Sequence, residues 1–274
     1  MEIRNGEDVY FVGKQVADAG VYRLYLCIQG ETERQCLLQI ASAVENNSGL
    51  DRAAYILGEL KQRSEEIEEE YGRVKKDPKD LLNYHLGFPE LVDSFICHQQ
   101  GGRRMNILAF RHVEDASRMI PLTNITFKDR LRVDLRTSVW IMGKLLKLFV
   151  FTHGEGFSVG LATGNNILIE PDQHYVLFFD WSGAKIHSSV LPVEIRRQEI
   201  SQAAQAVITV LGGKPETGAI PDDGDEAFGR YADFLHRLAR GSESNAERAH
   251  FQFYQLVDSL WKRGYYPFTT KPLS

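Results

Sequence analysis

The chain has 274 residues, of which 43% are hydrophobic, so it can bury a sizeable core or form two lobes around a cleft. It carries 32 Lys and Arg against 37 Asp and Glu, a formal net charge of -5, and such a global field attracts neither nucleic acid nor anionic lipid. No run approaches the roughly 18 apolar residues of a membrane span, and no basic region followed by an apolar stretch opens the chain. We therefore expect a globular, cytoplasmic protein that engages neither membranes nor nucleic acid.

The first half of the chain shows strand patterns around one amphipathic helix. The expected strands span 8–13, 21–29, 34–42, 94–100 and 105–111. GETE at 30–33 supplies the turn of one hairpin, and GGRR at 101–104 the turn of another. The helix is predicted over 50–74, where apolar residues recur at three-, four- or seven-residue steps and the other face is mostly charged.

After about residue 113 the pattern becomes helical. The segment 134–153 is apolar nearly all round, which is typical of a helix buried in a large core. Further helices are expected over 194–211, 225–240 and 247–263, and the segment 213–225, rich in Pro, Gly and Asp, is the clearest loop. Pattern alone thus predicts an α+β protein with two subdomains.

Three cysteines, Cys27, Cys36 and Cys97, occur without the paired spacing of zinc or redox motifs. We expect reduced thiols in the core.

The segment from Thr152 to Gly183 resembles the catalytic region of protein kinases. In that family a buried helix ends, a loop of the form H-R-D-L-x-x-x-N follows, and a short hairpin leads to the D-F-G aspartate. Asn166, followed by ILIE, stands at the loop asparagine, and Asp180, followed by Trp-Ser, stands at the D-F-G aspartate. Counting back from the asparagine places Val159 on the histidine and Leu161 on the catalytic aspartate of the loop.

Order and spacing elsewhere agree with this register over roughly residues 8 to 262. Gln39 falls at the lysine of the family's third strand, and Phe110 at the gatekeeper position of the hinge. Glu199 falls at the aspartate that anchors the catalytic-loop backbone. The resemblance implies one bilobal protein-kinase-like domain: a small antiparallel sheet plus helix over 1–113, and a larger helical lobe over 114–274.

The chemistry of phosphoryl transfer is missing at the matched positions. Transfer requires a carboxylate that orients the attacking hydroxyl and cations that neutralise phosphate charge. Leu161 accepts no proton, and Gln39 offers only a neutral amide. Asp180 and Glu199 are only about 19 positions apart, which leaves no room for a long activation segment. We therefore assign no catalytic residue.

The resemblance still leaves room for a weak site for ATP with Mg²⁺. Asn166 and Asp180 match the positions that hold Mg²⁺, a cation that prefers oxygen ligands. The residues matched to the nucleotide are Gly20, Gln39, Phe110 and His112. No G-x-G-x-x-G is present to cradle phosphates. The competing interpretation is structural: Asn166 caps a turn, and Asp180 ends a strand by bonding backbone amides.

Other polar residues are expected to be structural. Glu59, Glu65 and Glu66 are the candidates for the helix glutamate of the family's ion pair, and we favour a solvated acidic face without choosing among them. His153 and His174, near the matched catalytic loop, are expected to support the fold.

Three functions remain open at this stage. The favoured one is a pseudokinase that regulates or scaffolds another, unidentified protein. The alternatives are an unorthodox ATP-dependent phosphotransferase and a nucleotide-binding sensor. Loss of two catalytic positions together with the activation segment favours the first.

Overall fold

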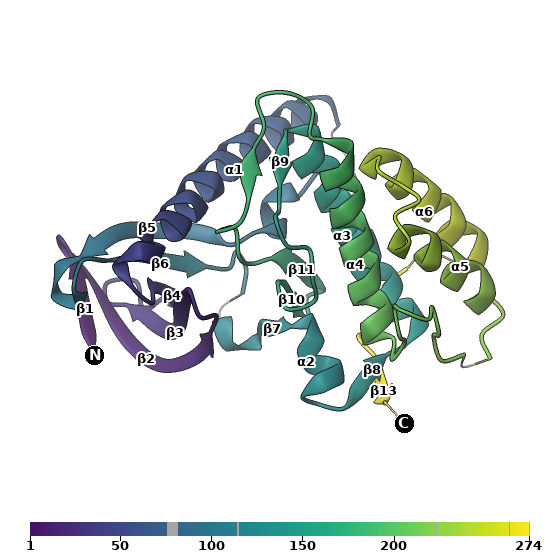
Figure 1. The fold of residues 1–274 in the computed structure, drawn as a ribbon, viewed down its shortest axis with the longest axis horizontal. Helices are drawn as coiled ribbons and strands as arrows, with labels where there is room; N and C mark the ends of the chain where they lie inside the picture. Colours follow the sequence, from purple (N-terminus) through teal and green to yellow (C-terminus); the bar gives the residue numbers. More distant parts are fainter. Residues whose placement is uncertain (76–81, 114, 223, 263, 274) are drawn as a thin grey trace. The chain divides into compact units, whose positions relative to one another are not determined.

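The computed structural model describes residues 1–75, 82–113, 115–222, 224–262 and 264–273 (Figure 1). It divides into two compact units, which are described separately. The N-terminal unit comprises Met1–Met119 together with Asp180–Ala184, and the C-terminal unit comprises Ile120–Phe179 with Lys185–Ser274. Glu114, the first residue of the predicted second lobe, lies outside the described residues. Within the described ranges, no helix combines the length and apolar character needed to cross a bilayer.

A six-stranded antiparallel sheet forms the N-terminal unit, in the order β1-β2-β3-β4-β6-β5. Its strands are β1 (Glu2–Asn5), β2 (Asp8–Asp18), β3 (Tyr22–Gln29), β4 (Gln35–Ala41), β5 (Glu90–Cys97) and β6 (Arg103–Ala109). The three cysteines are buried free thiols in the core on one side of this sheet. The sheet thus contains all five strands expected from alternation, with β1 added at its edge.

Several strand boundaries differ from the sequence expectation; β5, for example, begins at Glu90 and not at 94. The second strand of the sheet is longer than 8–13, because β2 continues pairing with β3 as far as Asp18, with irregular register on the way. Residues 98–100, expected as strand, form a short 3-10 turn. Gly101 and Gly102, both with positive φ, then reverse the chain into β6, so the turn begins earlier than its glycines suggest.

Helix α1 (Asn47–Val74) packs against β5 and β6 of the sheet (Figure 1). The predicted periodicity identifies the buried face correctly, since Leu50, Ala53, Leu57 and Leu60 are buried. The helix starts three residues before the expected residue 50, because Asn47 already has helical geometry.

The C-terminal unit is mainly helical (Figure 1). Its helices are α2 (Leu122–Phe127), α3 (Leu135–Gly154), α4 (Val193–Val210), α5 (Phe228–Ala239) and α6 (Ala246–Leu260). Helix α3 contacts both α4 and α6, which explains why it is apolar nearly all round. Asp134 caps its N-terminus by accepting a hydrogen bond from the Thr137 amide at 2.7 Å.

Short strands complete this unit and were not expected, apart from the hairpin implied by the kinase resemblance. They are β7 (Ile120–Pro121), β8 (Leu131–Val133), β9 (Phe157–Ser158), β10 (Ile167–Glu170), β11 (Tyr175–Phe178), β12 (Lys185–Ile186) and β13 (Thr270–Pro272). Strands β10 and β11 form the hairpin between Asn166 and Asp180 in the chain, and β7 pairs with β10.

Candidate functional site

Four residues from four neighbouring strands form a row on one face of the N-terminal sheet. Gln39 on β4 lies opposite Asn106 on β6, which in turn lies opposite Ser94 on β5. Gln39 also lies opposite Leu24 on β3, and Tyr22 is two residues before Leu24. Because opposite residues share a face and strand residues alternate with period two, all four row side chains project to the same side.

Hydrogen bonds connect three residues of this row. Ser94 Oγ donates to Asn106 Oδ1 at 2.8 Å, and Asn106 Nδ2 lies 3.3 Å from Gln39 Oε1. Burial raises the pKa of Tyr22 well above its ordinary value, and the nearby Asp180 carboxylate raises it further, while Gln39 opposes both. Tyr22 is therefore a neutral member of the row.

Gln39, at the lysine position, is therefore engaged with neutral neighbours. Its side chain is buried, with the residue 2% exposed. Asn106, which is fully buried, also donates to the Leu50 carbonyl of α1 at 3.0 Å, so the row is tied to the helix. A charged phosphate would meet amides and hydroxyls here, without a cation from this row.

The segment 180–184 is held within the N-terminal unit by backbone contacts. Asp180 Oδ1 accepts a hydrogen bond from the Ser182 amide at 2.9 Å, which closes an Asx turn. Arg52 of α1 donates to the Ser182 carbonyl at 3.1 Å. Trp181 is 1% exposed and belongs to the core. Asp180 thus bonds a backbone amide, the contact that the structural interpretation requires.

The other predicted nucleotide residues lie at turns or in the core. Gly20, with φ of 77°, closes the β2–β3 turn, and its amide donates to Asp18 Oδ1 at 2.9 Å. Phe110 is buried directly after β6, and His112 has a left-handed φ of 60°. Gly20 and Phe110 could offer a phosphate only backbone groups, and the role of all three residues toward a nucleotide stays a prediction.

Two of the three candidate glutamates on α1 lie near arginine side chains. Glu66 pairs with Arg63 at 2.7 Å, and Glu65 lies 3.8 Å from Arg111. Glu59 is partly exposed. For Glu66, hydrogen bonds from Gln62 and Arg63 lower the pKa below its ordinary value. Glu65 and Glu66 thus belong to an exposed acidic face.

In the C-terminal unit, a buried carboxylate anchors the matched catalytic loop. Glu199 on α4 is 2% exposed, and its Oε1 accepts a hydrogen bond from the Gly160 amide at 2.9 Å. Its Oε2 lies 2.9 Å from Nε2 of His153, near the end of α3. One turn further, Gln202 Oε1 accepts from the Ala162 amide at 3.0 Å. Two side chains of helix α4 therefore fix the loop backbone.

The side chains of this loop carry no acid or base at the matched positions. Val159 is fully buried, whereas Leu161 is 57% exposed. Asn166 Nδ2 donates to the Leu161 carbonyl at 2.8 Å, so the asparagine braces the loop. Asn166 and Asp180 belong to different units, so their predicted shared metal site stays a prediction. Among the described residues, no group of three or more His, Cys, Asp or Glu could hold a metal ion.

His174 turns the β10–β11 hairpin and belongs to an aromatic stack. Its φ is 57°, and its ring lies 4.5 Å from that of Trp140 and 4.9 Å from that of Tyr265, measured between centroids. Burial lowers the pKa of His174 below its ordinary value, and the positive charge of Lys144 lowers it further, while Glu170 opposes both. These packing contacts agree with a structural histidine.

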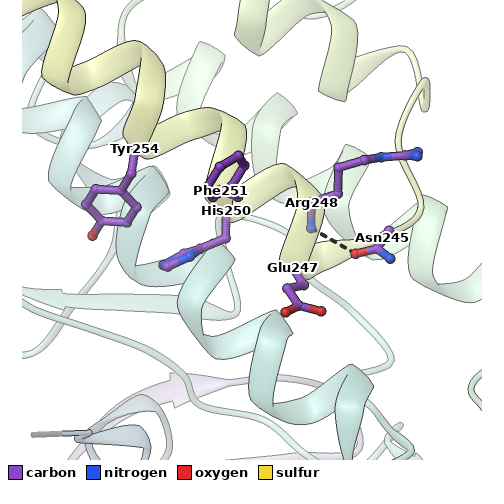
Figure 2. A pocket seen from close by; sticks show the side chains of 6 residues that line it. All are labelled: Asn245, Glu247, Arg248, His250, Phe251 and Tyr254. Atoms are coloured by element: carbon purple, nitrogen blue, oxygen red, sulfur yellow. Dashed lines mark hydrogen bonds between the residues drawn. The ribbon is translucent and has the colours of Figure 1, made fainter.

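A separate depression of about 790 Å³ lies along α6. Figure 2 shows that its labelled side chains come from the first part of this helix and its cap. They are Asn245, Glu247, Arg248, His250, Phe251 and Tyr254. The dashed line marks the cap itself, in which Asn245 Oδ1 accepts from the Arg248 amide at 2.8 Å (Figure 2). None of these residues was predicted to bind a ligand.

Sequence reasoning did not identify Tyr22 or Asn106 as members of the site. Tyr22 was only one apolar residue of an alternating strand, and Asn106 was unremarked within another. A polar residue on the inward face of a strand pattern is the signal that could have pointed to Asn106. No such signal existed for Tyr22, because a tyrosine on the inward face of a strand looks like any other core residue.

Comparison with solved structures identifies the fold. The structure of vaccinia related kinase 3 matches 95% of this chain and 90% of its own, with a TM-score of 0.61 and 13% identity. The BubR1 kinase domain matches 94% of this chain and 83% of its own, with a TM-score of 0.64 and 9% identity. No protein-family model and no curated protein matches the sequence. The chain therefore has the α+β protein-kinase fold, with an antiparallel N-terminal sheet and a helical C-terminal part.

Proposed function

We propose that this chain is a pseudokinase, a kinase-fold protein that transfers no phosphate and acts by binding another protein as a regulator or scaffold. The observation that carries this proposal is the state of the matched catalytic loop. Glu199 still anchors the loop backbone, while Leu161 occupies the place of the base. This loop keeps its backbone anchor but has an aliphatic side chain at the position of the base. Because an aliphatic side chain cannot accept a proton, the loop is suited to a structural role.

The lysine position supports the same function. Gln39 is neutral and its side-chain oxygen accepts a hydrogen bond from Asn106, so this position offers no charge to the phosphates of a nucleotide. The residues present fit ATP with Mg²⁺ poorly. Asp180 accepts a hydrogen bond from the Ser182 amide, and Asn166 braces the loop through its amide nitrogen.

The direct test is incorporation of labelled γ-phosphate from ATP with Mg²⁺, into the chain itself and into generic acceptors. The unmodified chain should remain at background. Leu161→Asp should not raise it, because Gln39 still leaves the phosphate charge unneutralised, and neither should Leu161→Asp combined with Gln39→Lys. Incorporation by the unmodified chain that disappears in Asp180→Ala would refute the pseudokinase proposal and favour an unorthodox phosphotransferase.

The scaffolding part requires a partner and a second test. Chemical cross-linking should identify a protein that then binds the purified chain directly. Its affinity should be the same for the unmodified chain and for Asp180→Ala, because a scaffold does not depend on a metal ligand. A partner that binds only with ATP and Mg²⁺ present, and not to Asp180→Ala, would favour the nucleotide-sensor alternative.

A further inference from the structure

A second depression, of about 270 Å³, lies in the C-terminal unit between α3 and α6. Its walls are rich in aromatic rings, among them those of Trp140, His174, Tyr254, Trp261, Tyr265 and Tyr266. A volume of this size admits a compound with one ring. None of these residues is matched to a catalytic or nucleotide position of the kinase family, so the depression is separate from the site described above.

One wall of this depression is a stack of three flat rings. The ring of His174 lies parallel to those of Trp140 and Tyr265, with interplanar angles of 13° and 4°. Tyr265 at the end of the stack is 77% exposed. A flat aromatic surface that ends in solvent offers a contact for another planar ring.

Arg136 supplies a cation to the same lining. Its guanidinium carbon lies 5.9 Å from the ring centroid of Trp261 and 4.8 Å from that of Tyr266. Within the part of the chain that the structure describes, this guanidinium makes neither an ion pair nor a hydrogen bond. Because stacking uses the faces of a guanidinium and its N–H donors lie in the plane, those donors remain available to an acceptor.

The lining has more donors than acceptors. Lys262 adds a second positive charge, and Asp258 is the carboxylate that opposes the two cations. The Nε1 atom of Trp140 is buried and has no hydrogen-bond partner among the described residues. An indole N–H can only donate, so it too lacks an acceptor. The ligand that suits this lining therefore carries acceptor atoms and a negative charge.

We propose that this depression binds a small planar carboxylate, a compound with one aromatic ring and one carboxylate group. The ring lies against the stack of Trp140, His174 and Tyr265, and the carboxylate pairs with the guanidinium of Arg136. Two parallel N–H···O bonds from a guanidinium match the geometry of a carboxylate, which gives the site its preference for this group. The proposal goes beyond the pseudokinase function and does not depend on it.

The test uses benzoate as the probe and benzamide, its neutral analogue of the same size, as the control. Nuclear magnetic resonance of the ¹⁵N-labelled full chain shows the indole signals of its three tryptophans, and Trp140→Phe identifies the signal of Trp140. Benzoate should shift the Trp140 signal and saturate it with a dissociation constant of about 10 mM or tighter, as expected for a ligand of about nine non-hydrogen atoms. Benzamide should bind at least about tenfold more weakly. The signal of Trp181, which is buried in the N-terminal unit, should stay in place.

A variant tests the part played by the cation. Arg136→Gln removes the charge and should weaken benzoate binding at least about tenfold, because a hydrogen bond to a charged group is lost. Arg237→Gln is the matched control. Arg237 on α5 lies over the ring of Phe234 at 5.6 Å but does not line this depression, so its variant should bind benzoate like the unmodified chain.

Three results would overturn the inference. One is the absence of a saturable shift of the Trp140 signal up to about 10 mM benzoate. Another is equal affinity for benzoate and benzamide, and the third is a folded Arg136→Gln variant that binds benzoate as tightly as the unmodified chain. The benzamide comparison uses the unmodified chain, so it decides the question even if Arg136→Gln fails to fold.

Discussion

The Nε2 atom of His153 lies 2.9 Å from Oε2 of Glu199, and both side chains are almost completely buried. The same carboxylate accepts the Gly160 amide through its other oxygen. One carboxyl group thus joins the end of α3, the matched catalytic loop and α4. A buried carboxylate is costly unless it is paired and hydrogen-bonded, and here both oxygens have partners.

We predict that Glu199→Ala lowers the free energy of unfolding by about 3 kcal/mol or more, because it removes one partner of a buried pair and leaves the Gly160 amide without an acceptor. Urea denaturation followed by circular dichroism measures the change. Glu194→Ala on the same helix is the control. The Glu194 side chain is 80% exposed and pairs with Arg197 at the surface, so its loss should change stability by less than about 0.5 kcal/mol. Equal effects of the two variants would show that the loop does not depend on Glu199.

The polar row of the N-terminal sheet gives a second prediction. Asn106→Leu keeps a similar volume but leaves the Gln39 oxygen, the Ser94 hydroxyl and the Leu50 carbonyl without their partner. We expect the free energy of unfolding to fall by about 1–3 kcal/mol, the cost of leaving buried polar groups unsatisfied.

The control for the row is Gln62→Ala, which removes an exposed side chain–side chain hydrogen bond to Glu66 on the solvent face of α1. It should be nearly neutral in the same urea titration. If Asn106→Leu were as stable as the unmodified chain, the hydrogen bonds of the row would contribute nothing to the free energy of unfolding.

Much of the fold followed from periodicity, because the elements that were predicted bury one face against a larger body. The alternation over 21–29 and the buried stripe of α1 correspond to real packing faces. The short strands β8 and β13 could not be found this way. Each has three residues, and they pair across more than 130 positions, so neither shows a periodic pattern of its own.

The site was predictable only where a position could be counted from a motif. Glu199 was placed by spacing, and the structure shows the carboxylate bound to the loop backbone as expected. The neighbours that give Gln39 its neutral surroundings were not predictable, because Tyr22 and Asn106 meet it through strand register rather than through sequence proximity. Contacts of that kind depend on which strands pair in the folded chain and in which register.

The last prediction concerns pH and His174. Burial lowers the pKa of His174 below 6.5, with a further contribution from the charge of Lys144 and an opposing one from Glu170. The unfolded chain therefore binds a proton at higher pH than the folded chain does. The stabilising contribution of the neutral ring is present above pH 6.5 and is lost as the pH falls from there through the folded pKa. His174→Asn removes this titration and keeps a residue type that tolerates the left-handed backbone at φ 57°.

Thermal unfolding between about pH 8 and about pH 5 should therefore show a larger loss of stability in the unmodified chain than in His174→Asn. Groups that titrate in both proteins, including His250, cancel in the difference. His98→Asn, at an exposed position in a turn, should follow the unmodified chain. Parallel pH curves for the unmodified chain and His174→Asn would mean that the ring stacked between Trp140 and Tyr265 accepts a proton as readily in the folded chain as in the unfolded one, and the stack would then contribute nothing to the pH dependence of folding.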